Sequence, residues 1–181
     1  MKRALLLLAA LLLACPEARP ASPELTVLLV RHGEAWTNVK APEGMTDAQK
    51  DALTPRGKEQ IAALVSSVRG RGVKAIFTSP LGRARESARI LGDALGLAPA
   101  ADEALRPFKD DEPPARAKAF VDSKRELGGT ILVVTHSDVI AELLGEASGT
   151  PAAEREKKHL VPTGSLAEIQ LGDRWRLVAP R

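Results

Sequence analysis

The sequence is short of aromatic residues and nearly devoid of cysteine. Its 181 residues include no Tyr, two Trp and three Phe. Proteins that bind single-stranded nucleic acid stack bases on aromatic rings, so no nucleic-acid partner is expected. The one cysteine, Cys15, excludes an intrachain disulfide. The formal net charge of +3 falls to about +1 if Lys2 and Arg3 leave with a leader, so charge does not favour an acidic polymer as partner.

The N-terminal apolar run is too short to span a membrane but has the pattern of a secretion signal. Lys2 and Arg3 precede apolar residues 4–14, and a membrane span needs about 20. The run ends in "LLAC", which resembles a bacterial lipobox, where the cysteine is lipidated. We therefore expect residues 1–14 to be a signal peptide, Cys15 to be a lipid anchor, and residues 15–24 to be a tether. The protein would then be exported to the periplasm or cell envelope; an ordinary cleaved signal with an incidental Cys15 is the alternative.

Strand and helix signals alternate along the rest of the chain. Apolar runs at residues 25–30 and within "GGTILVVTHS" (128–137) predict strands buried on both faces, and "KAIFTS" (74–79) predicts a short strand. Helices are predicted after Thr54 as cap and Pro55, after Ser79 as cap and Pro80 up to Gly96, and from Ala115 to Leu127. Residues 165–178 alternate around Gly172-Asp173 and predict a hairpin. We expect residues 25–181 to form one three-layer α/β/α sandwich, with a mostly parallel sheet and a C-terminal antiparallel hairpin.

Reactive polar residues follow three of the predicted strands. Arg31 and His32 end the first strand, and His136 ends the strand of residues 128–137. The short strand at 74–79 ends at Ser79, before a helix that carries Arg83 in its first turn. Because the carboxyl ends of parallel strands meet at one edge, these side chains are expected to share a ligand site. Arginines, histidines and the free N–H groups of helix N-termini together favour a compact dianion, and phosphate is the obvious candidate.

Four motifs occur in a fixed order along the chain. They are "RHGEAWTN" at 31–38, "LTPRGKEQ" at 53–60, "SPLGRARESA" at 79–88 and "VVTHSDVI" at 133–140. Each alone is weak, but together they closely resemble the histidine phosphatase superfamily, the phosphoglycerate-mutase-like group. Ala35 stands where that family usually has threonine. The resemblance implies a phosphoglycerate-mutase-like fold for the mature chain.

The resemblance also implies a role for each site residue. His32 would attack phosphorus and form a phosphohistidine that water then hydrolyses. Arg31 and Arg83 would bind the phosphoryl oxygens and stabilise transition-state charge. His136 would complete the pocket as an imidazolium or N–H donor, and Asn38 would be a further phosphate contact. No metal or other cofactor is implied, because cationic side chains neutralise the phosphate.

One departure from the family pattern concerns the general acid. Many members carry a glutamate shortly after the second helix, and Pro107 of "EALRPF" stands at that position. Proline cannot donate a proton to a leaving group. Either Asp110, Asp111 or Glu112 takes this role, or the substrate has a leaving group that needs little help; a merely solvated acidic loop is a further reading. The short interval between Arg83 and His136 has no room for a cap domain, which predicts a shallow, open pocket.

Three functions remain in competition at this stage. The first choice is an exported, metal-independent phosphatase acting on a phosphorylated small molecule or phosphoprotein. A phosphoglycerate-mutase-like phosphotransferase is disfavoured by the export signal and by Pro107. A non-catalytic phosphoryl-binding lipoprotein is disfavoured because binding alone has no need for the nucleophile His32.

Overall fold

The computed structural model describes residues 24–109 and 114–178. Cys15, the expected signal peptide and tether up to residue 23, and the candidate acids Asp110, Asp111 and Glu112 lie outside the described residues. The described elements, in chain order, are β1 (Leu25–Arg31), η1 (Trp36–Asn38), α1 (Asp47–Lys50), α2 (Pro55–Val68), β2 (Val73–Thr78), α3 (Gly82–Leu95), β3 (Pro99–Ala101), η2 (Glu103–Leu105), α4 (Ala115–Asp122), η3 (Arg125–Leu127), β4 (Gly129–Thr135), α5 (Ser137–Ser148), α6 (Ala152–His159), β5 (Leu166–Leu171) and β6 (Trp175–Val178). Within these ranges no helix is both long and apolar enough to cross a membrane.

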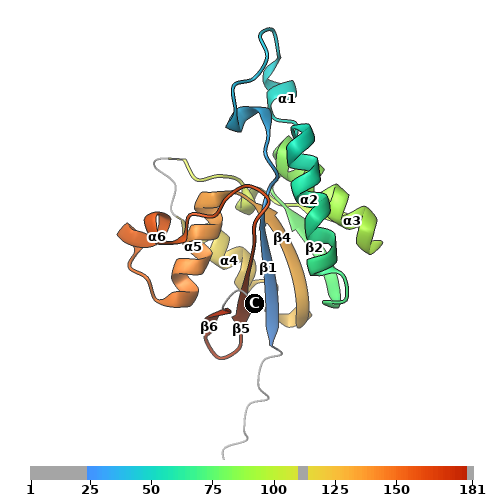
Figure 1. The fold of residues 1–181 in the computed structure, drawn as a ribbon. Helices are drawn as coiled ribbons and strands as arrows, with labels where there is room; N and C mark the ends of the chain where they lie inside the picture. Colours follow the sequence, from blue (N-terminus) through green and yellow to red (C-terminus); the bar gives the residue numbers. More distant parts are fainter. Residues whose placement is uncertain (1–23, 110–113, 179–181) are drawn as a thin grey trace, which may run out of the picture.

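The strands form one mixed six-stranded sheet. Its order is β3-β2-β4-β1-β5-β6 (Figure 1). β3, β2, β4 and β1 are parallel, whereas β5 runs antiparallel to β1 and pairs with β6 in the expected hairpin. The expected mostly parallel sheet with a C-terminal antiparallel hairpin is confirmed.

Alternation along β1 divides the core into two layers. Leu25, Val27 and Leu29 pack with residues of α4 and α5 on one face, and Leu28 and Val30 pack with residues of α2 and α3 on the other. Successive side chains of a strand point to opposite faces, so a strand covered by helices on both sides must be apolar throughout. Figure 1 shows these two helix layers flanking the sheet, with α6 beside α5. The three-layer sandwich is therefore confirmed.

The helix that carries Arg83 begins later than the sequence indicates. Thr54 caps α2 as expected, because its side chain accepts from Gly57 N and Pro55 takes the first position. Ser79 does not cap α3, whose N-cap is Leu81. Instead Ser79 stays beside β4, donating its backbone N–H to the Val134 carbonyl at 3.0 Å. The prediction of Ser79 as a cap and Pro80 as the first helical residue was wrong because the strand backbone continues through Ser79.

The third expected helix is shorter than predicted. α4 ends at Asp122, and the Ser123 hydroxyl donates to the Phe120 carbonyl at 2.6 Å. Serine side chains that bond nearby carbonyls compete with the helical pattern. The chain then makes only one further turn, η3, before Gly128 at φ +53.

Two glycines allow the first two motifs to touch. A Cβ on Gly33 would lie 2.3 Å from the Gly57 carbonyl oxygen, and a Cβ on Gly57 would lie 2.0 Å from the Glu34 carbonyl oxygen. Both distances are far below van der Waals contact, so the loop after β1 packs backbone to backbone on the first turn of α2. The Gln60 side chain, one turn later, accepts from Glu34 N at 2.8 Å and holds the same loop.

Gly57→Ala is expected to lower the free energy of unfolding by about 1–3 kcal/mol, since the added methyl forces the backbones apart. Urea denaturation measures this directly. Glu59→Ala, at an exposed position of the same helix, is the control and should stay within about 0.5 kcal/mol of wild type. A Gly57→Ala protein as stable as the control would mean that the close approach is dispensable.

Candidate active site

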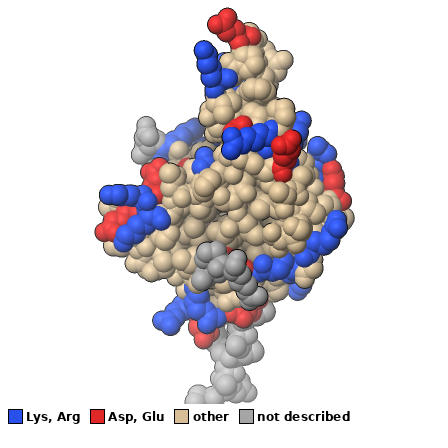
Figure 2. Space-filling model, in the orientation of Figure 1, with Lys and Arg blue, Asp and Glu red and all other residues tan. Residues whose placement is uncertain are grey.

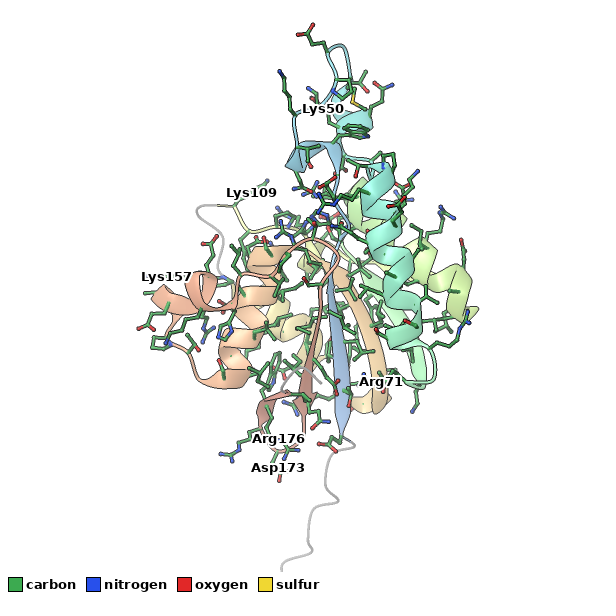
Figure 3. All side chains as sticks on the ribbon, in the orientation of Figure 1. Lys50, Arg71, Lys109, Lys157, Asp173 and Arg176 are labelled. Atoms are coloured by element: carbon green, nitrogen blue, oxygen red, sulfur yellow. The ribbon has the colours of Figure 1, made fainter. Side chains whose placement is uncertain are left out.

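Strand register places the two motif histidines side by side. β1 and β4 pair in parallel, and their last paired residues are Arg31 and Thr135. His32 and His136 come directly after this pair, one on each strand. His32 N–H donates to the Thr135 carbonyl at 3.0 Å. The ring centroids lie 5.1 Å apart at 61°, and each histidine is only 3% exposed. In Figure 3 side chains crowd above the upper ends of β1 and β4, at the opposite end of the sheet from the labelled Arg176 and Asp173.

Arg83 bridges the two rings. Its Nε–H donates to His32 Nε2 at 3.2 Å, and Nη2 lies 3.4 Å from His136 Nδ1. Arginine has only donors, so both of these ring nitrogens must be acceptors. The remaining nitrogens then carry the protons: His32 Nδ1 donates to the Gly33 carbonyl at 2.7 Å, and His136 Nε2 to Ser79 Oγ at 2.8 Å. The lone pair of His32 Nε2 is therefore available as a nucleophile once Arg83 turns to a ligand.

Burial keeps both rings neutral. Desolvation lowers the pKa of His32 to about 4; the Gly33 carbonyl opposes this, and the positive charges of Arg83 and Arg31 add to it. Desolvation also lowers the pKa of His136 to about 2, with the His32 ring and Arg83 as further causes. The imidazolium expected for His136 is thus disfavoured in this arrangement. The neutral form leaves the His32 nitrogen unprotonated, as a nucleophile requires.

Arg31 is held by hydrogen bonds to the segment that precedes β5. Its Nη1 donates to the Val161 carbonyl, while its buried Nε has no hydrogen-bond partner among the described residues. Gly164 N–H donates to the carbonyls of Arg31 and His32, both at 3.1 Å. Burial lowers the pKa of Arg31 and Asp138 opposes the shift. The segment before β5 therefore fixes the end of β1 and leaves Arg31 with N–H groups for an anion.

Asn38 is bonded to the backbone of its own turn. It is exposed at the end of η1, and its Oδ1 accepts from Ala35 N at 3.0 Å. This bond shapes the turn after the first motif, with Ala35 itself fully buried. A phosphate contact for Asn38 stays a prediction.

Three polar residues of the site were missed by sequence reasoning. Ser79 was taken as a helix cap but bonds His136. Asp51 pairs with Arg83 through Oδ1 and accepts from Gly82 N through Oδ2. Asp138 accepts from Phe108 N at 2.6 Å. Its place two residues after His136 was a usable signal, whereas nothing local distinguishes Asp51 from the other acids of its loop.

The backbone around Pro107 is held by hydrogen bonds with two side chains. Arg116 donates to the carbonyls of Arg106 and Pro107 at 2.7 and 2.8 Å, and its guanidinium stacks 4.6 Å from the Phe108 ring centroid. The Asp138 bond to Phe108 N holds the same segment from α5. Pro107 itself supplies no proton, so a general acid at this position is excluded.

No cluster of three or more His, Cys, Asp or Glu able to hold a metal ion occurs in the described part of the chain. The positive charge found at the site comes from Arg31 and Arg83. Guanidinium groups bind phosphate oxygens through paired N–H donors. The arrangement can hold a phosphoryl group and attack it with a neutral imidazole.

In phosphate-free buffer, NMR titration of the imidazole nitrogens should give a midpoint near pH 4 for His32 and a lower one for His136. The unfolded protein in urea should titrate near the ordinary value of about 6.5. Because the unfolded chain then binds more protons, the free energy of unfolding should fall as pH drops from about 6.5 toward 4. Titration of either folded ring near 6.5 would show that the rings are not desolvated as described.

A family model matches the part of the chain that holds the first three motifs. The model of the histidine phosphatase superfamily, branch 1, matches residues 27–109. A probable phosphoglycerate mutase GpmB from Yersinia enterocolitica is 40% identical over 83 residues, which are 45% of this chain. The GpmB of Erwinia tasmaniensis is 39% identical over the same length. The match covers only 37% of each relative's length.

Solved structures share the fold over nearly the whole described chain. YhfR of Bacillus stearothermophilus has a TM-score of 0.73 and 24% identity, over 84% of this chain and 95% of that one. A mycobacterial glucosyl-3-phosphoglycerate phosphatase has a TM-score of 0.69 and 22% identity, over 87% and 98%. A phosphoglycerate mutase from Bacillus anthracis has a TM-score of 0.71 and 17% identity, over 88% and 93%. These likenesses confirm the phosphoglycerate-mutase-like fold, and the family-model match identifies residues 27–109 as a histidine phosphatase superfamily segment.

Proposed function

We propose that this protein is a metal-independent phosphatase that hydrolyses phosphoryl groups through a phosphohistidine on His32. The observation that carries the proposal is the placement of the neutral His32 Nε2 against the guanidinium of Arg83, with Arg31 close enough to affect the His32 pKa. A nucleophile beside two cationic clamps is the arrangement that in-line phosphoryl transfer needs.

The first step forms a nitrogen–phosphorus bond and breaks the bond from phosphorus to the leaving group. Arg83 turns its N–H groups from His32 to the phosphoryl oxygens, and Arg31 binds them with the donors that Val161 leaves free. His32 becomes positively charged as it attacks, and its Nδ1–H bond to the Gly33 carbonyl stabilises that charge. In the second step water attacks phosphorus, releases inorganic phosphate and restores neutral His32.

His136 would donate a hydrogen bond to the bound phosphoryl group. A bound phosphoryl dianion raises the pKa of a neighbouring imidazole, because it favours the charged form. His136 then shifts toward the N–H donor expected from the family resemblance. Its Nε2–H bond to Ser79 holds the ring, so Nδ1 is the atom that meets the ligand.

Hydrolysis is favoured over phosphotransfer by the segment after α3. A mutase must protonate and deprotonate an alkyl oxygen, and the family's glutamate for this work is replaced by Pro107. The described residues between α3 and β4 form only β3, η2, α4 and η3, which supports an open site without a cap. An open site suits a phosphorylated small molecule or a phosphoprotein. The binding-only alternative is disfavoured by the intact placement of His32.

Turnover is expected to depend steeply on the leaving group. Without a general acid, aryl phosphates and phosphoramidates should react well and alkyl phosphates poorly, because charge on the departing alkoxide is not quenched. Rates for a graded series of phosphomonoesters measure this. His32→Ala should abolish turnover of all of them, and wild type quenched during turnover should carry an acid-labile phosphohistidine.

The same series tests the loop carboxylates. If Asp110, Asp111 or Glu112 is the acid, the dependence on leaving-group pKa flattens. Substitution to Asn or Gln then slows alkyl substrates by about 10²–10⁴-fold and aryl substrates far less. A flat dependence that survives all three substitutions would defeat both versions of the mechanism.

We propose export and membrane anchoring of this protein from the sequence of its first 15 residues. Cys15 and the signal residues 1–14 would place the phosphatase in the periplasm or cell envelope, tethered to a membrane. Metabolic labelling with a fatty acid should mark the wild type, and Cys15→Ser should remove the label. An unlabelled, soluble periplasmic wild type would disprove the anchor and leave export in place.

A further inference from the structure

The segment between the first two motifs carries a carboxylate into the site. Residues 39–52, which include α1, project from the body near the carboxyl end of β1 (Figure 1). Lys50, the last residue of α1, is labelled on this projection in Figure 3, and Asp51 follows it. Asp51 Oδ1 forms an ion pair with Arg83 Nη1, and Oδ2 accepts from Gly82 N at 2.6 Å. The projection is thereby joined to the guanidinium that bridges both histidines.

The backbone that follows Asp51 is held by two hydrogen bonds. Trp36 N–H donates to the Ala52 carbonyl at 3.2 Å, and Leu53 N–H donates to Glu86 Oε2 of α3 at 2.9 Å. A Cβ on Gly82 would lie 2.9 Å from Asp51 Oδ2 and 3.2 Å from the Asp51 carbonyl oxygen. A side chain at the start of α3 would crowd both oxygens, and Gly82 leaves room for the carboxylate. The position of the carboxylate is therefore set by the fold and not by a freely moving surface loop.

The donors of Arg83 are divided among three partners. Nη1 goes to Asp51, Nε to His32 and Nη2 toward His136. Because a guanidinium is planar, the contact at Nη1 limits how the edge formed by Nε and Nη2 can turn from the rings to a ligand. Both Asp51 oxygens accept N–H bonds, so the carboxylate is oriented at both of its oxygens.

Charge balance supports the same role. Figure 2 shows acidic and basic side chains interspersed over the visible face, with no field of a single sign. Within the site, Asp51 offsets the positive charge of Arg83, and its negative charge opposes the lowering of the His32 pKa. The ion pair is mostly buried, with side-chain exposures of 16% for Arg83 and 24% for Asp51. An ion pair so shielded holds its geometry better than an exposed one.

We propose that Asp51 is a positioning residue for phosphoryl transfer. It holds Arg83 so that Nε and Nη2 meet the phosphoryl oxygens as they spread into the equatorial plane of the transition state. The proposal rests on the proposed phosphatase function. Without Asp51, Arg83 can still attract a phosphate, but its N–H groups are no longer placed for the transition state. The rate of the chemical step should therefore fall more than the affinity for phosphate.

The test is Asp51→Asn, with Asp47→Asn as matched control. Asn keeps an oxygen for Gly82 N–H, whereas Asp47 lies on the same projection with a fully exposed side chain. With p-nitrophenyl phosphate, Asp51→Asn should lower kcat by about 10–100-fold and change KM by less than about threefold. The affinity for orthovanadate, which mimics the transition state, should fall more than the affinity for inorganic phosphate. Asp47→Asn should match wild type.

A double-mutant cycle separates positioning from simple capping of α3. In the Arg83→Ala background, Asp51→Asn should cause no further loss of kcat, because the residue it positions is absent. A full additional loss there would overturn the proposal in favour of a structural cap. Tighter phosphate binding with undiminished kcat in Asp51→Asn would overturn it too, and show that Asp51 competes with the ligand.

An NMR measurement keeps the inference testable if wild type hydrolyses no phosphomonoester, an outcome that would disprove the proposed function. The Arg83 Nε–H resonance should be resolved and slow to exchange with solvent in wild type and in Asp47→Asn. Asp51→Asn should broaden it or speed its exchange at least several-fold. An unchanged resonance in Asp51→Asn would show that Asp51 does not hold the guanidinium.

Discussion

The parallel pairing of β1 with β4, with Arg31 opposite Thr135, is the constraint on which the site depends. It brings together two histidines separated by about a hundred residues of sequence and sets their rings 5.1 Å apart. A slip of one residue would turn one of them to the other face of the sheet, because side chains alternate along a strand. Arg83 reaches both rings because β2, which leads into α3, pairs with β4 on its other side.

The close packing of two histidines and two arginines explains which of them carry charge. Two imidazoles buried beside two guanidiniums cannot both be protonated, so their pKa values fall and the arginines carry the positive charge. Asp51 pairs with Arg83, and Asp138 opposes the lowering of the Arg31 pKa. Cationic donors held near a neutral nucleophile are suited to a ligand that brings its own negative charge. A phosphoryl group meets that condition, and neither histidine needs a positive charge before such a ligand arrives.

Two short segments border the site, and the described residues form no cap domain over it. Arg116 and Asp138 pin the backbone from Arg106 to Phe108, where the family's glutamate is replaced by proline. The projection of residues 39–52 reaches the site from the other direction through Asp51. Loops carried on a rigid sheet are where enzymes of one fold diverge in specificity. Of the two, the segment of Pro107 departs from the family pattern in its sequence.

Local patterns in the sequence were sufficient for the framework. Apolar runs identified β1 and β4, Thr54 and Pro55 marked the start of α2, and the motifs indicated the residues that meet at the sheet edge. They did not reveal α6, a charged helix with no buried residues of its own that Arg155 ties to Glu142 and Glu146 of α5. Nor did they reveal the roles of Ser79 and Asp51. Periodicity and caps arise from neighbours a few residues apart, so they can be read along the chain. Asp51 and Arg83 are 32 positions apart and Ser79 and His136 are 57 apart, so these contacts exist only once the sheet has brought their strands and loops together.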